Sequence, residues 1–305
     1  MFKAHRNTSA CWNAPVILAI AVVVAVLVSL SGCGTTTEKS SFDAYSWDEL
    51  SKISKEISSA DSDEEGEEIA KSYHLLDSSG KLDGKAKSVA LSDGTKASVL
   101  IAGIRQDDLA SGGKAGITCM FADAPAAHAM NADSSNEGGW EKSEMRSWLN
   151  GEFEGMLPSD LKAVIVAANK KTNSSAYTSP GAVSTTADNL WLPSLVELSG
   201  SVAADATLRG SGIPAGTYNA EGKQYQLFAE KGVSAGEENS VLVRVFVGDD
   251  SLDSGLVVKG EACPCWERSL STTWTSGFEA TDADGDPLNA WITDYQLGVA
   301  PGFCL

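Results

Sequence analysis

The chain has 305 residues, of which 41 are Asp or Glu and 23 are Lys or Arg, so its formal net charge is −18. This acidity argues against binding to nucleic acid and against direct adsorption to anionic lipid. Glycine is frequent, with 29 residues, and stretches of helical periodicity are few. These features favour a loop-rich fold with a substantial β component.

Residues 1–32 have the features of a lipoprotein signal peptide. Lys3 and Arg6 give a positive start, and residues 15–30 form an uncharged apolar run. This run has about 16 residues, fewer than the ~20 that a membrane-spanning helix prefers. It ends in the sequence Leu-Ser-Gly-Cys at residues 30–33, which resembles the lipobox of bacterial lipoproteins.

In proteins with a lipobox, the signal peptide is cut just before the cysteine, whose thiol is diacylated. The small residues 31 and 32 give the peptidase access to the bond, and the Cys33 thiol accepts the lipid. Two acyl chains anchor a protein stably where one is marginal. We therefore expect a lipid-anchored protein on the extracytoplasmic face of the cell membrane. Cleavage removes Lys3 and Arg6 and no acid, so the expected mature charge is −20.

Two segments are expected before the main domain. Residues 33–46 are rich in Thr and Ser and are expected to form a lipidated tether. Residues 47–84 are expected to be helical and acidic, because Trp47, Leu50, Ile53 and Ile57 recur at helical spacing. The acidic run 61–68 interrupts this helix, and a second short helix is expected over residues 67–73. We interpret the run as a solvated charge block.

From residue 85 to residue 305 the pattern predicts an α+β domain. A hairpin is predicted over residues 88–91 and 97–102, around a turn at Asp93-Gly94, and a buried strand over 116–121. An amphipathic helix ends before Pro158. Further predicted features are strands over residues 164–168, 190–194, 224–228 and 241–247, a polar loop over 171–188, and an insertion over about 199–240.

Cys119, Cys263, Cys265 and Cys304 remain after the signal peptide and lipobox cysteines are set aside. An even number in an oxidising compartment suits two disulfides, with three possible connectivities. Cys263 and Cys265 flank one proline, so a bridge between them is expected to be strained, and each is expected to pair with Cys119 or Cys304. The alternative is four buried thiols that act as small hydrophobic side chains.

Four segments, taken together, resemble a bacterial family of domains of unknown function. Its members carry an R-x-W-L-N helix, a W-L-P-S-x-x-E segment, a W-x-R-S segment and a terminal G-V-x-P-x-F-x-L segment. In this chain the four motifs stand at residues 146–150, 191–197, 266–269 and 298–305. The resemblance covers residues 85–305 and is specific only in combination.

That family is distantly similar to the C-type lectin-like fold, which also includes formylglycine-generating enzymes. The resemblance implies a compact α+β, C-type lectin-like domain with long loops, preceded by the short N-terminal helical segment. It assigns no catalytic residue, because no activity is established for the family. Non-cysteine residues are expected in relatives where Cys119 and Cys304 stand, so a bridge between these two is the first connectivity to test.

The C-terminal aromatic residues are candidates for ligand binding. Trp266, Trp274 and Trp291, together with Arg268, could line a groove for a sugar or a peptide, since exposed tryptophans stack on ligand faces. The alternative is that these tryptophans belong to the core.

Asp282, Asp284 and Asp286 alternate as the carboxylates of calcium loops do. Pro287 and Thr293 stand where the EF-hand template requires glycine and glutamate, so an acidic turn is favoured and any calcium binding is expected to be weak. No other cofactor is expected. The Cys263-Pro264-Cys265 segment lacks the C-x-x-C spacing at a helix start, so thiolate activation is not indicated.

The leading hypothesis is a non-enzymatic, surface-tethered binding module for a glycan or for an envelope or host protein. It rests on the lipobox, the lectin-like resemblance and the lack of a catalytic constellation in the sequence. Two alternatives are an extracytoplasmic thiol- or metal-dependent enzyme and a structural envelope protein.

Overall fold

The computed structural model describes residues 36–174, 183–202, 215–249, 255–271 and 274–305. The expected signal peptide, residues 1–32, and Cys33 lie outside the described residues. Residues 36–305 form one unit by their internal contacts. Within the described ranges, every helix is too short or too polar to cross a membrane.

Two helices form the N-terminal part of the described chain, as predicted. In α1 (Trp47–Ser58), the Ser46 hydroxyl accepts a hydrogen bond from the Glu49 N–H, and the Glu49 carboxylate accepts one from the Ser46 N–H, which makes a capping box. Helix α2 (Asp63–Ser72) begins inside the acidic run, before the predicted start at residue 67. It does so because Ser62 caps it and because carboxylates are favourable at a helix N-terminus.

The segment expected as a tether is partly packed against the domain. The 3-10 helix η1 (Phe42–Ala44) places Phe42 in the core, and Tyr45 is also buried. One hydrophobic core contains Phe42, Trp47 and Leu50 together with residues from the chain beyond position 85. The helical segment and the following α+β domain are therefore one folded unit.

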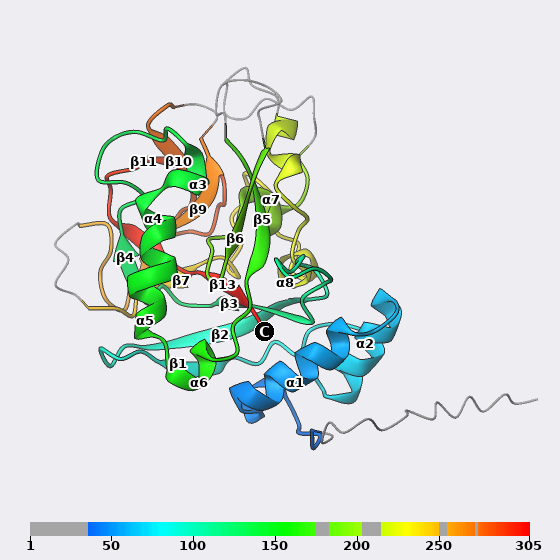
Figure 1. Ribbon diagram of the computed structural model, residues 1–305. Helices are drawn as coiled ribbons and strands as arrows, with labels where there is room; N and C mark the ends of the chain where they lie inside the picture. The colour runs from blue at the N-terminus through cyan, green and yellow to red at the C-terminus, as the bar shows by residue number, and fades with distance from the viewer. Residues whose placement is uncertain (1–35, 175–182, 203–214, 250–254, 272–273) are drawn as a thin grey trace, which may run out of the picture. The chain divides into compact units, whose positions relative to one another are not determined.

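In the part of the chain that the structure describes, the strands form two sheets and two separate strand pairs (Figure 1). The first sheet has the order β1-β2-β3-β13, formed by β1 (Lys87–Ala90), β2 (Lys96–Ile104), β3 (Ile117–Phe121) and β13 (Gly302–Cys304). The second has the order β11-β10-β9-β12-β4, formed by β11 (Asn289–Ile292), β10 (Gly277–Thr281), β9 (Cys265–Leu270), β12 (Leu297–Val299) and β4 (Ala126–His128). The pairs are β5 (Ala168–Asn173) with β6 (Val183–Asp188), and β7 (Arg244–Val245) with β8 (Ala262–Cys263). The architecture is mixed α+β, as predicted.

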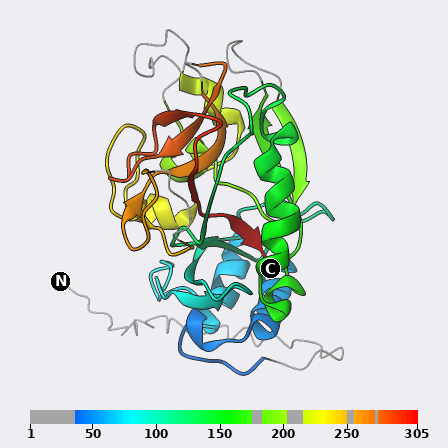
Figure 2. The same ribbon diagram turned by 90° about the vertical axis from the view of Figure 1, so that its left-hand side faces the viewer.

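The predicted helix before Pro158 is a succession of short turns. Figure 2 shows the green helices following one another in a single column. They are α3 (Gly139–Lys142), α4 (Glu144–Trp148), the π-helical turn η2 (Leu149–Phe153) and α5 (Glu154–Met156). The remaining helices are α6 (Ser159–Lys162), α7 (Leu195–Ser199), η4 (Ala215–Ala220) and α8 (Gln226–Glu230).

The predicted hairpin and buried strand are confirmed as β1, β2 and β3, whereas four other strand predictions were wrong in whole or in part. Residues 164–167 are not a strand, and β5 and β6 stand where a polar loop was expected. Hydrophobic alternation does not reveal β5, because the side chains that it buries include the polar Lys170 and Thr172. Helix α8 stands where a strand was predicted over residues 224–228. The strand predicted over 241–247 is shortened to β7, and the strand predicted over 190–194 is a single β-bridge at Trp191.

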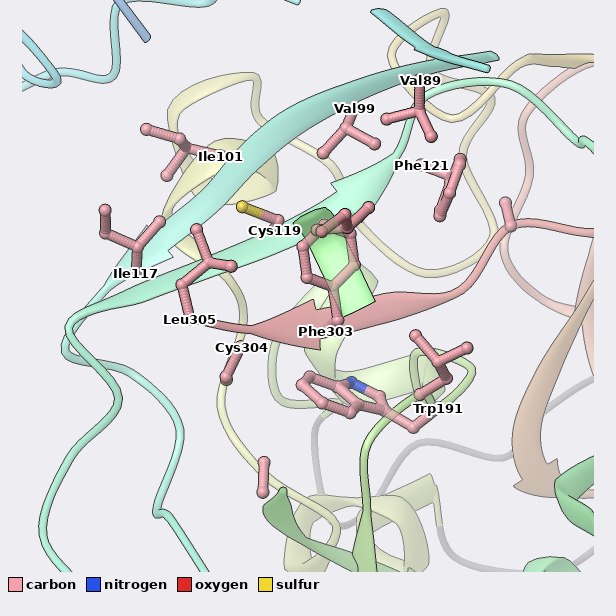
Figure 3. Packing of buried hydrophobic residues seen from close by; sticks show 14 of the residues in the cluster. Val89, Val99, Ile101, Ile117, Cys119, Phe121, Trp191, Phe303, Cys304 and Leu305 are labelled. Atoms are coloured by element: carbon pink, nitrogen blue, oxygen red, sulfur yellow. The ribbon is translucent and has the colours of Figure 1, made fainter. Parts of the chain in front are cut away.

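The last strand, β13, pairs with β3 and forms one edge of the first sheet. Phe303 is fully buried, and its ring lies edge-on to Trp47 at 6.0 Å and to Phe121 at 6.2 Å between centroids. Figure 3 shows Phe303 beside Cys119, with Trp191 on the other side of the strand. The Ser54 hydroxyl of α1 donates to the Leu305 carbonyl, so this strand joins the N-terminal helix to the sheet.

The disulfide expected between Cys119 and Cys304 is absent. Cys119, Cys263, Cys265 and Cys304 are all buried free thiols in the structure. In the β3–β13 pair, Cys119 lies opposite Phe303 and Cys304 lies opposite Thr118. Neighbouring residues of a strand point to opposite faces, so the two sulfurs lie on different sides of the sheet and cannot bond without a change of register.

Candidate functional site

A cleft of about 480 Å³ opens between α2, the end of β2, β5 and the segment 219–225. Most of the residues that line it are charged or polar. Its volume lies in the range typical of small-molecule sites, although such sites are usually lined mainly by apolar groups. The cleft is therefore suited to a polar ligand.

Lys170 forms the floor of this cleft, with a side chain only 2% exposed. Its ammonium group lies 2.6 Å from Asp107 Oδ1 and 2.6 Å from Glu197 Oε1, and it donates to the Tyr225 hydroxyl at 2.9 Å. It also lies 4.6 Å from the centre of the Trp191 ring. These contacts use all three ammonium donors, which offsets the cost of burying the charge.

A bidentate ion pair between Glu197 and Arg268 lies next to Lys170. Arg268 Nη2 donates to Glu197 Oε1 at 2.9 Å, and Nη1 donates to Oε2. Both residues are buried. Burial alone would raise the pKa of Glu197, but the charges of Arg268 and Lys170 more than offset it and lower this pKa to about 2. Glu197 is thus a permanent anion within the core.

The remaining donors of Arg268 fix the backbone around the cleft. Nη1 donates to the Leu192 carbonyl at 2.9 Å, and Nε donates to the Thr172 hydroxyl at 3.2 Å. Nη2 reaches the carbonyls of Lys171 at 3.2 Å and Glu221 at 3.1 Å. A single side chain in β9 therefore positions β5, the segment before α7 and the segment 219–225 at the cleft.

Local structure explains why Glu197 points toward Arg268. Ser194 caps α7, and the Glu197 carboxylate accepts a hydrogen bond from the Ser194 N–H at 3.0 Å, which completes a capping box. Both residues belong to the W-L-P-S-x-x-E motif, and Arg268 belongs to W-x-R-S. In the third motif, Arg146 donates to Asp188 at 2.6 Å. These motif side chains are part of the interior framework.

Glu221 is the second buried carboxylic acid at the cleft. The Asn173 N–H donates to its Oε1 at 3.0 Å, and the Ser269 hydroxyl donates to its Oε2. Burial raises the pKa of Glu221 to about 7, although the charge of Arg268 opposes this shift. Glu221 can therefore exchange a proton near neutral pH, but both of its oxygens already accept hydrogen bonds from the protein.

Two exposed lysines are among the residues that line the cleft. Arg105 is paired with Asp63 at 2.9 Å, and Lys114 with Asp108 at 2.7 Å. Lys171 and Lys223 are exposed, and neither is paired with a carboxylate in the part of the chain that the structure describes. The lining thus contains two lysines and one exposed carboxylate, Glu67, that have no ion-pair partner among the residues that the structure describes.

The four ligand-binding candidates predicted from the sequence do not share one groove. Trp266 and Arg268 are in the interior, 1% and 0% exposed. Trp274 is 47% exposed, and Trp291 is half-buried with its ring 5.6 Å from that of Tyr295. A Cβ atom placed on Gly277 would lie 3.5 Å from the Trp274 ring, whereas Trp291 approaches that position only with its backbone carbonyl oxygen, so the two rings do not form one patch.

Asp282, Asp284 and Asp286 lie in an acidic turn, and the carboxylates of Asp282 and Asp286 are engaged within it. Asp282 Oδ1 accepts from the backbone N–H groups of Asp284 at 3.0 Å and Asp286 at 2.9 Å, and its Oδ2 accepts from the Asn289 side chain at 2.8 Å. Asp286 Oδ1 accepts from the Leu288 N–H at 2.9 Å. Among the residues that the structure describes, no three His, Cys, Asp or Glu side chains come together to hold a metal.

The greater part of the chain matches a known protein family. A family model described as Domain of unknown function (DUF6273) matches residues 107–305. The chain belongs to this family. The matched residues include Lys170, Glu197 and Arg268. No curated protein and no solved structure matches the chain.

Sequence reasoning missed the floor of the cleft in the DUF6273 domain. Asp107, Lys170 and Tyr225 come from three segments that are far apart in sequence, and none of them lies in a motif. The one available signal was the alternation of Lys170 and Thr172, which are polar residues two positions apart on what is now seen to be a strand.

Replacing Arg268 with Met should destabilise the domain by about 3–5 kcal/mol, because the Glu197 charge stays buried without its main partner. The double variant Arg268→Met with Glu197→Leu should recover part of this loss, since both charges are removed together. Urea unfolding measures both free energies. Lys52→Gln is the matched control, because it breaks an exposed pair with Asp48 and should cost no more than about 1 kcal/mol. Equal losses for Arg268→Met and Lys52→Gln would contradict the role given to this ion pair.

The raised pKa of Glu221 gives a second prediction. The folded protein holds this proton more tightly than the unfolded chain does, because the pKa is about 7 in the fold and 4.5 as the ordinary value. The contribution of Glu221 to the free energy of unfolding is therefore fully present below pH 4.5, and it falls by about 3 kcal/mol as the pH rises through 7. Glu221→Gln should lose this dependence, so its stability relative to the parent should rise by that amount between about pH 4.5 and pH 8. A difference that stays constant with pH would show that Glu221 is not the titrating group.

Proposed function

We propose that the protein is an extracytoplasmic lipoprotein, held at the membrane by lipid on Cys33, whose DUF6273 domain binds an acidic glycan in the Lys170 cleft. The proposed ligand class rests on one observation. Lys171 and Lys223, which have no carboxylate partner among the residues that the structure describes, line a cleft whose polar floor is held by ion pairs. The anchor rests on the lipobox at residues 30–33 and on the uncharged apolar run before it.

The chemistry of the cleft favours a ligand that is both hydroxylated and negatively charged. Sugar hydroxyls donate and accept hydrogen bonds, and the lining offers both kinds of group. The exposed ammonium groups of Lys171 and Lys223 add charge-assisted hydrogen bonds for a carboxylate or phosphate on the sugar. The resemblance of the family to the C-type lectin-like fold, which includes sugar-binding lectins, agrees with this ligand class.

Binding explains the cleft better than catalysis does. A catalytic carboxylate needs a free oxygen that reaches the substrate. The Glu197 oxygens accept from Lys170, Arg268 and the Ser194 N–H, and the Glu221 oxygens accept from Asn173 and Ser269. Both acids are therefore engaged in holding the floor of the cleft in place.

A glycan array probed with the full chain in detergent tests the ligand. Acidic glycans should be retained and their neutral counterparts should not. Lys171→Gln and Lys223→Gln should each weaken binding about tenfold, the effect of one charge-assisted hydrogen bond. Lys162→Gln is the matched control, since this exposed lysine lies in α6 and not in the cleft.

The same array separates the competing sites, and a parallel array of envelope proteins separates the competing partners. If Trp274→Ala abolishes binding while both cleft lysine variants bind normally, the site is at Trp274 and the cleft proposal is wrong. If no glycan binds but an envelope protein does, the ligand class is wrong. Retention of neutral and acidic glycans with equal strength would also contradict the role of the two lysines.

The anchor is tested separately in cells that are fed labelled palmitate. The parent chain should incorporate the label, and Cys33→Ala should give an unprocessed precursor without it, because the thiol is the acyl acceptor. Cys11→Ala is the matched control, since this cysteine lies inside the predicted signal peptide, and it should be labelled normally. Labelling that persists in Cys33→Ala would show that the lipobox interpretation is wrong.

A further inference from the structure

Two of the four buried thiols lie close together. The sulfurs of Cys263 and Cys265 are 3.9 Å apart and share a hydrogen bond. The first ends β8 and the second begins β9, with Pro264 between them. Residues two positions apart along extended chain point to the same side and are separated by about 6.6 Å, which is within the Cα–Cα range that a disulfide can span.

Gly298 provides the space in which these sulfurs meet. A Cβ atom placed on Gly298 would lie 2.7 Å from Cys265 Sγ and 2.8 Å from Cys263 Sγ, closer than side-chain atoms approach one another. The Gly298 N–H donates to the Pro264 carbonyl at 2.8 Å, which fixes β12 against the Cys-Pro-Cys segment. Any larger residue at this position would force the sulfurs to move.

A buried cation faces the same pair. Arg244 lies directly opposite Cys263 in the β7–β8 ladder, so the two side chains are on one face. Its guanidinium donates to the Val241 carbonyl at 2.6 Å, and it forms no ion pair with any residue that the structure describes. Buried charges in proteins are normally paired. The carboxylate of Asp123 acts on Arg244 from nearby, and a thiolate on the neighbouring sulfurs would add a second negative charge.

We propose that Cys263 and Cys265 are a reversible dithiol–disulfide pair that exchanges with low-molecular-weight disulfides and whose thiolate is stabilised by Arg244. The distance between the sulfurs, the space at Gly298 and the position of Arg244 support this pair independently of one another. Cys119 and Cys304, on opposite faces of the β3–β13 ladder, are the two thiols in the same core that cannot pair.

The exchange proceeds in two balanced steps. The Cys263 thiolate attacks one sulfur of the reagent disulfide, which forms a mixed disulfide and releases one reagent thiolate. Cys265 then gives its proton to solvent and attacks Cys263 Sγ, which closes the protein disulfide and releases the second reagent thiolate. Two electrons pass from the cysteine pair to the reagent, and one sulfur–sulfur bond is made for the one that is broken.

The surroundings of Cys265 suit it to the second step. The hydrogen bond with Cys263 and, after it, burial raise the pKa of Cys265, which favours its protonated form. Cys265 also lines a small cavity of about 20 Å³ together with Arg244. Since both sulfurs are nearly inaccessible in the closed structure, exchange requires local opening and should be slow.

The test uses the full chain equilibrated in mixtures of reduced and oxidised glutathione until its thiol content stops changing. Free thiols are then trapped with N-ethylmaleimide under denaturing conditions and located by mass spectrometry after trypsin digestion. Cys263 and Cys265 fall in one tryptic peptide, residues 260–268. This peptide should carry an internal disulfide in oxidising mixtures and two labels in reducing ones, whereas Cys119 and Cys304 should be labelled throughout.

Two variants test the geometry. The half-oxidation point is the ratio of the squared concentration of reduced glutathione to the concentration of oxidised glutathione at which half of the cysteine pair is oxidised. Arg244→Gln should raise this value about tenfold, toward more reducing mixtures, because the reduced form loses a charged hydrogen bond. Lys52→Gln, which breaks an exposed ion pair with Asp48 in α1, should leave that point unchanged. Gly298→Ala should prevent closure, and a thermal melt shows whether that variant is folded.

The parent chain alone is sufficient to overturn the proposal. Labelling of Cys263 and Cys265 at every glutathione ratio, to the same extent as Cys119 and Cys304, would do so. Mixed disulfides with glutathione in place of the internal bond would do so as well. A half-oxidation point that is the same for the native and the urea-unfolded chain would show that the fold does not promote pairing.

Discussion

The buried contact between Glu197 and Arg268 is the interaction on which the arrangement of the DUF6273 domain depends. It joins the start of α7 to the middle of β9, and the other donors of Arg268 hold carbonyls of β5, the segment before α7 and the segment 219–225 at the cleft. Glu197 in turn neutralises Lys170, which forms the floor of the cleft. Because each of these buried charges compensates another, removing one of them leaves its partners uncompensated, which is costly. Two family motifs, W-L-P-S-x-x-E and W-x-R-S, meet in this single contact.

The parts of the fold that could be predicted from the sequence are those whose burial follows a simple period. Trp47, Leu50, Ile53 and Ile57 mark α1, and the Asp93-Gly94 turn marks the β1–β2 hairpin, because apolar spacing and turn chemistry agree there. Strand β5 could not be found in this way, since it buries Lys170 and Thr172 against charged partners. The cleft could not be found either, because Asp107, Lys170 and Tyr225 become neighbours only through the tertiary fold.

The N-terminal helices belong to the same structural unit as the family domain, although the family match begins only at residue 107. Helix α1 packs closely against the start of β3, where a Cβ atom on Gly116 would lie 1.9 Å from the Ser54 carbonyl oxygen. Arg105 donates to the carbonyls of Ile57 and Ser58 at the end of α1 and to Asp63 at the start of α2. These helices therefore fix one wall of the cleft as well as covering the first sheet.

The position of β13 has a consequence for how quickly this fold can form. Thr118 and Cys304 are 186 residues apart in sequence, and Ser54 and Leu305 are 251 apart, yet each pair is in direct contact in the core. Contacts of such long range must wait for large loops to close, and chains that depend on them fold slowly. Until β13 arrives, β3 has an unpaired edge beside apolar side chains, which another unfinished copy could take up in its place. The yield of refolded protein should therefore fall as the chain concentration rises.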